Sequence, residues 1–277
     1  LSTINIPNKD LEIITFDVKN ADAFLIKTPK NKYFIIDTAK ASYNSRSSTA
    51  KLVISKYLKD KGIKNIEGLI LTHFDLDHAG GAVDLLNDLN IKNVYVNSLN
   101  ESNYTSHLIF KALETKHIKP ILVQNNNIIY SENNFNFKTY ISKIKNNDNE
   151  NSIITLLSYK NFDMIFMGDA GVIGFNEIKK DIKNNIEILK VGHHGGRFVV
   201  NKEMLNHINN NVSIISTGPN TFGHPNKATL DILKNTDIYR TDKNNSIKIK
   251  TDGIKYTLYT FNTTDKKYEK QLQYKTY

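Results

Sequence analysis

The chain has 277 residues, which is enough for one large domain, or two small ones, with a full hydrophobic core. It contains no cysteine, so disulfides, a cysteine nucleophile and cysteine-ligated zinc are excluded, and no run approaches the roughly 18 consecutive apolar residues of a membrane helix. The 37 Lys and Arg residues against 28 Asp and Glu give a formal net charge of +9, which favours a polyanionic partner such as nucleic acid. An AT-rich genome also produces an abundance of Lys, Asn and Ile, so the charge by itself leaves both explanations open.

The first quarter of the chain predicts short strands and one helix. Runs rich in Ile, Phe and Val, separated by polar or Pro-containing turns, predict strands over residues 11–18, 23–27 and 32–37. Apolar residues then recur at helical spacing from Ser48, and Gly62 stands where a C-terminal cap is expected. The next run is almost wholly apolar, as in a strand buried on both faces, and covers residues 68–72.

The rest of the chain alternates between helices and strands, with hairpins and loops expected over residues 124–151. Helices are expected over residues 82–89, 102–117, 175–184, 202–208 and 227–234. Strands are expected over residues 93–97, 121–123, 152–158, 162–167, 186–191, 212–217, 237–241, 246–250 and 255–261. No Gly-, Ser- or Pro-rich linker divides the chain, so we predict an α/β fold in which two sheets are flanked by helices, a four-layer αββα sandwich. This single domain is expected over residues 1–262, followed by a basic, peripheral tail over residues 263–277.

Four potential metal ligands follow the apolar strand. His73, Asp75, Asp77 and His78 fall within six residues at its end. Alternation along an extended segment directs the first three to one side, and His78 joins them where the chain turns toward the next helix. Imidazole and carboxylate groups at this density suit one or two divalent metals, whereas a helix-capping loop needs only one such residue. The sequence therefore predicts a metal centre at this strand end.

Three later strand ends carry the same kinds of side chain. Asp169 follows one hydrophobic strand, His193 and His194 follow another between glycines, and His224 follows a third through a glycine-containing loop. Loops at one end of parallel strands converge on one cleft. We therefore expect five of the eight histidines and three aspartates to meet there.

These motifs resemble the metallo-β-lactamase superfamily, whose signature is His-x-His-x-Asp-His after a buried strand; here Asp75 stands where the signature has its second His. In detail the chain resembles the domain of that superfamily found in ComEC-type DNA-uptake competence proteins. The matching segments, in chain order, are residues 17–23, 73–81, 149–152, 168–169, 189–195, 220–225 and 239–242. The sequence departs from that pattern at Lys19, Asn20 and Ala21, which replace Gly-Gln-Gly, and in lacking the long membrane part of a competence channel.

The resemblance implies a metal-dependent phosphodiester hydrolase, a DNA nuclease in the first place, that uses water activated by two divalent ions, zinc or manganese. His73 and Asp75 would hold one metal, Asp77 and His78 the other, with Asp169 bridging and His194 completing the second site. The implied catalytic residues are Asp77, Lys190, His193 and His224, and the implied substrate contacts are Lys190, Asn220 and His224. Because Asp75 replaces a His, the first site is richer in oxygen, which makes manganese a competitor of zinc.

Two other functions stay open from the sequence. A phosphodiesterase that acts on a small phosphoester such as phosphocholine would use the paired histidines equally well. A catalytically silent nucleic-acid-binding domain would keep only the basic surface. β-Lactam hydrolysis is disfavoured because Asp75 and the His-His-Gly loop point to phosphoesters.

The start of the chain has no signal-peptide pattern. The chain begins with Leu1 rather than Met, so we expect it to be processed or cut from something longer. As part or associate of a membrane DNA-uptake protein it would act on the extracytoplasmic face. As a free-standing relative it would be cytoplasmic.

Overall fold

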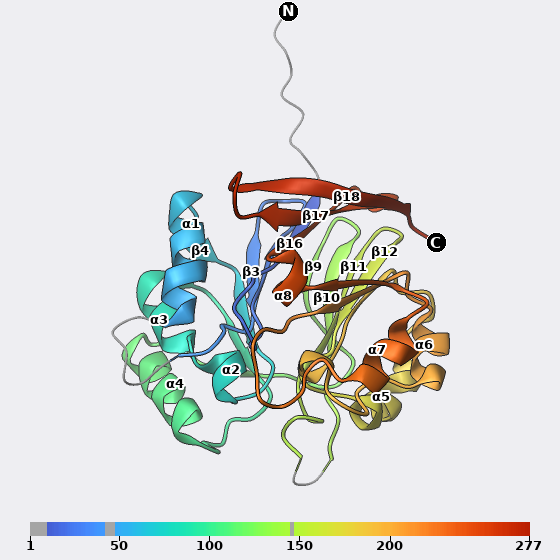
Figure 1. The fold of residues 1–277 in the computed structure, drawn as a ribbon. Coiled ribbons are helices and arrows are strands. Elements are labelled where there is room, and N and C mark those ends of the chain that lie inside the picture. Colours follow the sequence, from blue (N-terminus) through green and yellow to red (C-terminus); the bar gives the residue numbers. More distant parts are fainter. Residues whose placement is uncertain (1–9, 42–47, 145–146) are drawn as a thin grey trace, which may run out of the picture.

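Two β-sheets lie at the centre of the computed structural model, which describes residues 10–41, 48–144 and 147–277 (Figure 1). Within these residues the larger sheet has nine strands, in the spatial order β18 (Lys267–Lys275), β17 (Lys255–Asn262), β16 (Ile247–Thr251), β1 (Leu11–Thr15), β2 (Phe24–Lys27), β3 (Tyr33–Ile36), β5 (Gly68–Leu71), β7 (Val94–Val96) and β8 (Ile121–Leu122). The smaller sheet has seven described strands, in the order β15 (Asp237–Arg240), β14 (Val212–Ile215), β13 (Ile188–Lys190), β12 (Phe162–Phe166), β11 (Ile154–Tyr159), β10 (Phe135–Tyr140) and β9 (Asn127–Glu132). A short parallel pair consists of β4 (Asn65–Ile66) and β6 (Asn90–Ile91).

Aromatic side chains from both sheets pack against each other in the core between them. Phe24 of β2 meets Phe166 of β12 edge-on, with ring centroids 5.2 Å apart. The ring centroids of Phe34 in β3 and Phe137 in β10 are 4.9 Å apart. All four rings are buried, and such pairs stabilise a core beyond the area that they bury. The inward-facing residues of the two sheets therefore form one continuous core.

Helices cover both outer faces of this sandwich, as Figure 1 shows. The larger sheet is covered by a wide helical segment, η1 (Ala50–Ser55), that leads into α1 (Lys56–Asp60), and by α3 (Ala82–Asp88) and α4 (Tyr104–Thr115). The smaller sheet is covered by α5 (Val172–Ile178), with its extension η2 (Lys179–Asp181), α6 (Lys202–Ile208) and α7 (Lys227–Leu233). The predicted αββα architecture is confirmed.

Several strands of both sheets end at the same edge of the sandwich. In the larger sheet β3 and β5 are parallel neighbours. In the smaller sheet β12, β13 and β14 are parallel to one another. The residues that follow β5, β12, β13 and β14 carry the polar side chains singled out from the sequence, because the carboxyl ends of parallel strands open onto a common crevice.

Several elements were not expected. α2 (Leu76–Ala79) forms within the predicted metal-binding segment, and α8 (Thr241–Asn244) follows β15. Beyond Asn262, where we expected a peripheral basic tail, β18 pairs antiparallel with β17 and forms the edge of the larger sheet. The rings of Tyr274 in β18 and Tyr256 in β17 stack with centroids 4.9 Å apart. The segment therefore packs through aromatic residues, although its many charged residues led us to predict a peripheral tail.

The first loop contains Lys19, Asn20 and Ala21, at which the sequence departs from the expected Gly-Gln-Gly. Lys19 adopts a φ of 66°, a left-handed conformation that glycine would adopt more easily. Gly218 packs directly on it, because a Cβ added to Gly218 would lie 2.6 Å from the Lys19 Cα. The backbone N–H of Asp22 donates to the carbonyl oxygen of Asp77 at 3.1 Å, which ties this loop to α2.

None of the helices in the described part of the chain combines the length and the apolar character that crossing a bilayer requires. Leu1, on which the expectation of an excised chain rests, lies outside the described residues, as do positions 145 and 146 of the expected hairpin region.

Candidate metal centre

The chain turns sharply inside the His73–His78 segment. Asp75 has extended backbone angles (φ −69°, ψ 150°) and directly precedes α2, so Asp77 and His78 are helical rather than extended. This turn brings the His78 ring back over the His73 ring, with centroids 4.3 Å apart. The alternation expected from the sequence therefore ends at Asp75, and α2 directs Asp77 and His78 into the crevice.

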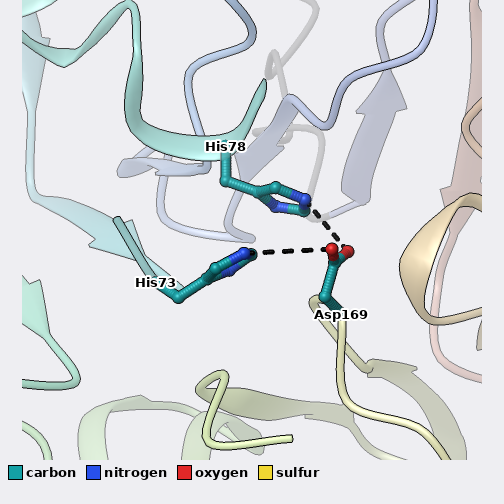
Figure 2. Close-up of side chains that lie close together, drawn as sticks. All are labelled: His73, His78 and Asp169. Atoms are coloured by element: carbon teal, nitrogen blue, oxygen red, sulfur yellow. Dashed lines mark ion pairs between the residues drawn. The ribbon is translucent and has the colours of Figure 1, made fainter. Parts of the chain in front are cut away.

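One group of potential ligands consists of His73, His78 and Asp169 (Figure 2). The Nε2 atom of His78 lies 3.0 Å from Asp169 Oδ1, and that of His73 lies 3.8 Å from Asp169 Oδ2. All three side chains are buried. His73 Nε2, His78 Nε2 and Asp169 Oδ1 lack a hydrogen bond of good geometry, which is costly for buried polar atoms unless a further group satisfies them.

A second group shares His78 and adds Asp77 and His194. The Nε2 atom of His194 lies 3.2 Å from Asp77 Oδ2. His194 follows β13 in a short turn, η3 (His193–Gly195), where both histidines have left-handed backbone angles, φ 45° and 51°. Such angles are unfavourable for residues with a Cβ and occur most often at functional sites. Gly192 lets this turn lie close to the Ala170 backbone, since a Cβ at Gly192 would lie 2.1 Å from the Ala170 carbonyl oxygen.

Asp75 and His193 lie at the rim of these groups. The Asp75 side chain is 49% exposed, and its Oδ2 is 3.6 Å from His73 Nε2. The His193 side chain is 38% exposed, and its Nε2 is 3.8 Å from Asp169 Oδ2. Its other nitrogen lies 3.5 Å from the Asn149 side-chain amide. Both residues therefore face the solvent side of the centre while keeping one polar atom near it.

Neighbouring groups hold the Nδ1 atoms of the buried histidines. His78 Nδ1 lies 2.8 Å from Asp37 Oδ2, whose carboxylate also accepts from the Thr72 backbone and hydroxyl. His194 Nδ1 lies 2.9 Å from the Ser216 carbonyl oxygen. Carboxylate and carbonyl oxygens only accept, so each Nδ1 donates to its partner and each Nε2 is the nitrogen that faces the centre. Such partners are typical of metal-binding histidines.

Ser152 joins His73 to Asp169. Its hydroxyl oxygen lies 3.2 Å from His73 Nδ1 and accepts from the Asp169 backbone N–H at 3.2 Å. The segment that precedes β11 therefore positions a ligand from each sheet.

Lys190 lies beneath the centre and not on its open side. Its side chain is fully buried, and its ammonium group pairs with Asp22 and donates to the Gly168 carbonyl oxygen at 3.1 Å. We expected Lys190 to contact substrate phosphate or to protonate the leaving oxygen, and the structure corrects this. The physical reason is that Asp22 is also buried, and a buried carboxylate needs a counter-charge.

Asn220 also differs from its expected role as a substrate contact. Its amide donates to the carbonyl oxygens of Gly218 and His224, and its oxygen accepts from the backbone of Phe222 and His224. Every polar atom of the side chain is thus used within its own loop. His224, by contrast, retains a buried Nδ1 without a partner among the described residues and lies beside His193, with ring centroids 5.2 Å apart.

The charges of the centre stabilise one another. Burial opposes a charged His78, but Asp169 and Asp37 outweigh it and hold the pKa of His78 well above its usual range. Burial likewise opposes a charged Asp77, yet the hydrogen bond from His194 and the nearby His78 lower the pKa of Asp77 to about 2. Burial also opposes a charged Asp169, but His78 and His194 outweigh it and hold the pKa of the Asp169 carboxyl well below its usual range. Without metal, protons on the imidazoles thus compensate the carboxylates.

These groups fit divalent metal ions. Two ligand atoms held about 2.0–2.2 Å from one ion lie about 3.0–3.6 Å apart. The nitrogen-to-oxygen distances of 3.0, 3.2, 3.6 and 3.8 Å described above are close to that spacing. The unsatisfied buried atoms of His73, His78 and Asp169 are the ones that an ion would satisfy.

Two buried aspartates of the site were not recognised from the sequence as functional. Asp37 contacts His78, and Asp22 lies between Lys190 and the two imidazoles of His78 and His194, 3.8 and 3.6 Å from their Nδ1 atoms. A usable signal existed for Asp37, because it directly follows an apolar strand, as the recognised ligands do. Asp22 stood within the matched segment 17–23 but without an assigned role.

Comparison with known proteins identifies the family. The model of the metallo-β-lactamase superfamily matches residues 17–218. The chain is 26% identical over 252 residues to ComE operon protein 3 of Bacillus subtilis (strain 168), covering 86% of this chain and 32% of that protein. It is 28% identical over 207 residues to Recombination protein 2 of Haemophilus influenzae, covering 75% of this chain and 24% of that protein. The chain thus spans between a quarter and a third of the length of these relatives.

A solved structure supports the fold independently. Igni18, a metallo hydrolase from the archaeon Ignicoccus hospitalis, superposes with a TM-score of 0.52 at 13% identity. The match covers 86% of this chain and 98% of that one. At this identity the likeness extends to the fold alone.

Proposed function

The chain belongs to the metallo-β-lactamase superfamily, and from this premise we propose that it is a metal-dependent phosphodiester hydrolase that cleaves DNA. The observation that carries the proposal is the convergence of Asp77, Asp169 and three imidazole Nε2 atoms, those of His73, His78 and His194, at one edge of the sandwich. Similarity to proteins named for the ComE operon and for recombination supports DNA as the substrate. The net charge of +9 supports a polyanion.

Two metal ions have enough ligands in this arrangement. The first would be held by His73 and Asp75, and the second by Asp77, His78 and His194. Asp169 would bridge, because its two oxygens face His78 and His73 respectively. The first set is rich in carboxylate oxygen and suits manganese, whereas the second has two imidazoles and also suits zinc.

Bound divalent ions lower the pKa of a water ligand and neutralise charge on phosphate oxygens. The chain's own residues prepare the site for this chemistry. Asp37 and Ser216 fix the orientation of His78 and His194, and Lys190 compensates Asp22 below them. His193 is half-exposed at the rim, where its imidazole would contact a phosphate oxygen or give a proton to the leaving oxygen. His224, adjacent to it, would assist in binding the phosphate.

A substrate panel tests the proposal. The chain is stripped with chelator and reloaded with zinc or with manganese. It is then given plasmid DNA, single-stranded DNA, RNA, a generic phosphodiester, a phosphocholine ester and a β-lactam. We expect metal-dependent cleavage of DNA and of the generic phosphodiester, and no β-lactam turnover.

Two outcomes would replace this proposal with another function. Hydrolysis of the phosphocholine ester without DNA cleavage would establish a small-phosphoester phosphodiesterase. DNA binding without stoichiometric metal would establish a silent nucleic-acid-binding domain. The buried, unsatisfied ligand atoms of His73, His78 and Asp169 argue against the silent domain.

The similarity to these longer proteins also supports a proposal about the biological process that the activity serves. Because the match covers only 32% and 24% of the relatives named for the ComE operon and for recombination, we propose that this activity serves DNA uptake as part of, or beside, a larger membrane protein.

A further inference from the structure

A cleft of about 450 Å³ opens directly beside the metal centre. Asp77, a proposed metal ligand, and Leu76 form one wall, and the loop that precedes α7 forms the other with Pro219 and Phe222. The exposed side chain of Lys40 also lines it. The cleft thus combines a basic group, apolar surface and an aromatic ring within reach of the proposed reaction site.

Phe222 is unusually exposed for an aromatic residue, at 74%. Single exposed apolar residues are common on protein surfaces, so exposure alone would mean little. This one, however, stands on a loop that Asn220 braces with four hydrogen bonds, one of them from the Phe222 backbone N–H at 3.0 Å. A braced loop presents its ring at little further entropic cost when a ligand binds.

A series of rings connects Phe222 to the metal centre. The Phe222 and His224 rings are 5.8 Å apart and tilted by 32°. The His224 and His193 rings are 5.2 Å apart, and His193 Nε2 lies 3.8 Å from Asp169 Oδ2. A phosphodiester at the metal centre would therefore place the adjoining base beside Phe222.

We propose that this cleft binds one unpaired nucleotide next to the phosphodiester that is cleaved. Phe222 stacks on its base, and Lys40 contacts the backbone phosphate beyond it. A base within a duplex has both faces covered by its neighbours, so stacking on Phe222 requires an unpaired or extruded base. The site therefore prefers single-stranded DNA, without preference among the bases, because every base offers a π-face. The inference rests on the proposed DNA substrate and adds the strand type to it.

Binding to metal-free protein tests the cleft without any need for cleavage. Fluorescence anisotropy compares a labelled oligothymidylate with an abasic strand of equal length and charge. With the unaltered chain, removing the bases should weaken binding about 5- to 150-fold, the usual range for aromatic stacking. With Phe222→Leu the two strands should bind within about twofold of each other.

Phe198→Leu is the matched control, since Phe198 is also 74% exposed but does not line the cleft. This variant should discriminate between the two strands as the unaltered chain does. If Phe198→Leu loses the discrimination between the two strands as fully as Phe222→Leu does, the assignment to this cleft is overturned. It is also overturned if the unaltered chain binds both strands equally. Displacement of the oligonucleotide by phosphocholine, but not by thymidine 5′-monophosphate, would also overturn it.

The proposed nuclease function and the proposed nucleotide cleft are tested by different measurements, so each can fail without the other. If no metal supports DNA cleavage while Phe222→Leu still abolishes the discrimination between strands, the nuclease proposal is wrong and the nucleotide cleft stands. If DNA is cleaved but Phe222→Leu changes neither base discrimination nor the ratio of single-strand to duplex cleavage, the cleft is wrong and the nuclease stands.

Discussion

The Nδ1 atom of His194 lies 2.9 Å from the carbonyl oxygen of Ser216, and this contact fixes which imidazole nitrogen faces the candidate metal centre. A carbonyl oxygen only accepts, so Nδ1 donates to it, and Nε2 is the nitrogen that faces Asp77. Asp37 acts in the same way on His78. The site thus directs these Nε2 atoms toward the metal position before any ion arrives, as metal-binding sites generally do.

Asp77→Ala should abolish DNA cleavage in manganese, with a loss of about a thousandfold or more. The variant removes a proposed metal ligand, and a bound metal contributes several kcal/mol to catalysis of this kind. Plasmid nicking measures the loss, and circular dichroism checks that the fold remains. Asp231→Asn, an exposed carboxylate on α7 that pairs with Lys227, is the control and should keep full activity. Retained nuclease activity in Asp77→Ala would refute the assignment.

Asp37→Asn should weaken metal binding by about 10- to 100-fold, the usual effect of removing a carboxylate that orients a histidine ligand. Asp37 would touch no metal, but it holds both His78 Nδ1 and Thr72. A competition assay with a chelating dye gives the dissociation constant. Glu101→Gln, which removes an exposed carboxylate beside His107, should leave that constant unchanged. An Asp37→Asn protein with unaltered metal affinity would contradict the orienting role.

Metal affinity should fall as the pH falls. The pKa of His78 is raised because Asp169 and Asp37 outweigh burial, so metal-free His78 keeps a proton at neutral pH. Metal binding must displace that proton, and below the raised pKa each displaced proton weakens binding about tenfold per pH unit. Calorimetry in two buffers of different ionisation enthalpy should detect proton release at pH 7. In Asp37→Asn fewer protons should be released, and binding without proton release in the unaltered chain would refute this account.

Lys190→Met should destabilise the fold by about 3–5 kcal/mol, because it removes the buried lysine that pairs with the buried Asp22. Urea unfolding of the metal-free protein measures the change. Adding Asp22→Asn should restore much of the loss, since the uncompensated charge is then gone. Lys227→Met, at an exposed ion pair, should change stability by less than about 1 kcal/mol. A Lys190→Met protein of normal stability would return Lys190 to the phosphate-binding role that we first expected.

DNA binding should weaken steeply with salt if the positive charge of the chain contacts phosphates. Each contact with duplex phosphate contributes about 0.9 to the slope of log affinity against log salt, so a few contacts give a slope of about −3 or steeper. Titrations at four salt concentrations measure it. If the affinity for DNA does not change with salt concentration, the net charge of +9 reflects a bias in composition and not contacts with phosphate.

The alternation of the chain was sufficient to predict most of the fold. Period-two and period-3.6 apolar patterns are local, and they predicted strands and helices close to those observed, such as β5 and α6. The layered architecture followed because such elements must bury one face each. β18 was missed because its many charges conceal the aromatic residues that pack it.

The sequence by itself also determined which strand ends carry ligands. The tertiary structure alone decided how these residues are shared and supported. His78 takes part in three groups of potential ligands, the third with Asp22 and Asp37, because α2 turns it back over His73. Lys190 is a buried counter-ion because Asp22, 168 residues away, lies against it. Local patterns carry no information about such distant pairs, since burial and electrostatics arise only when both sheets have packed.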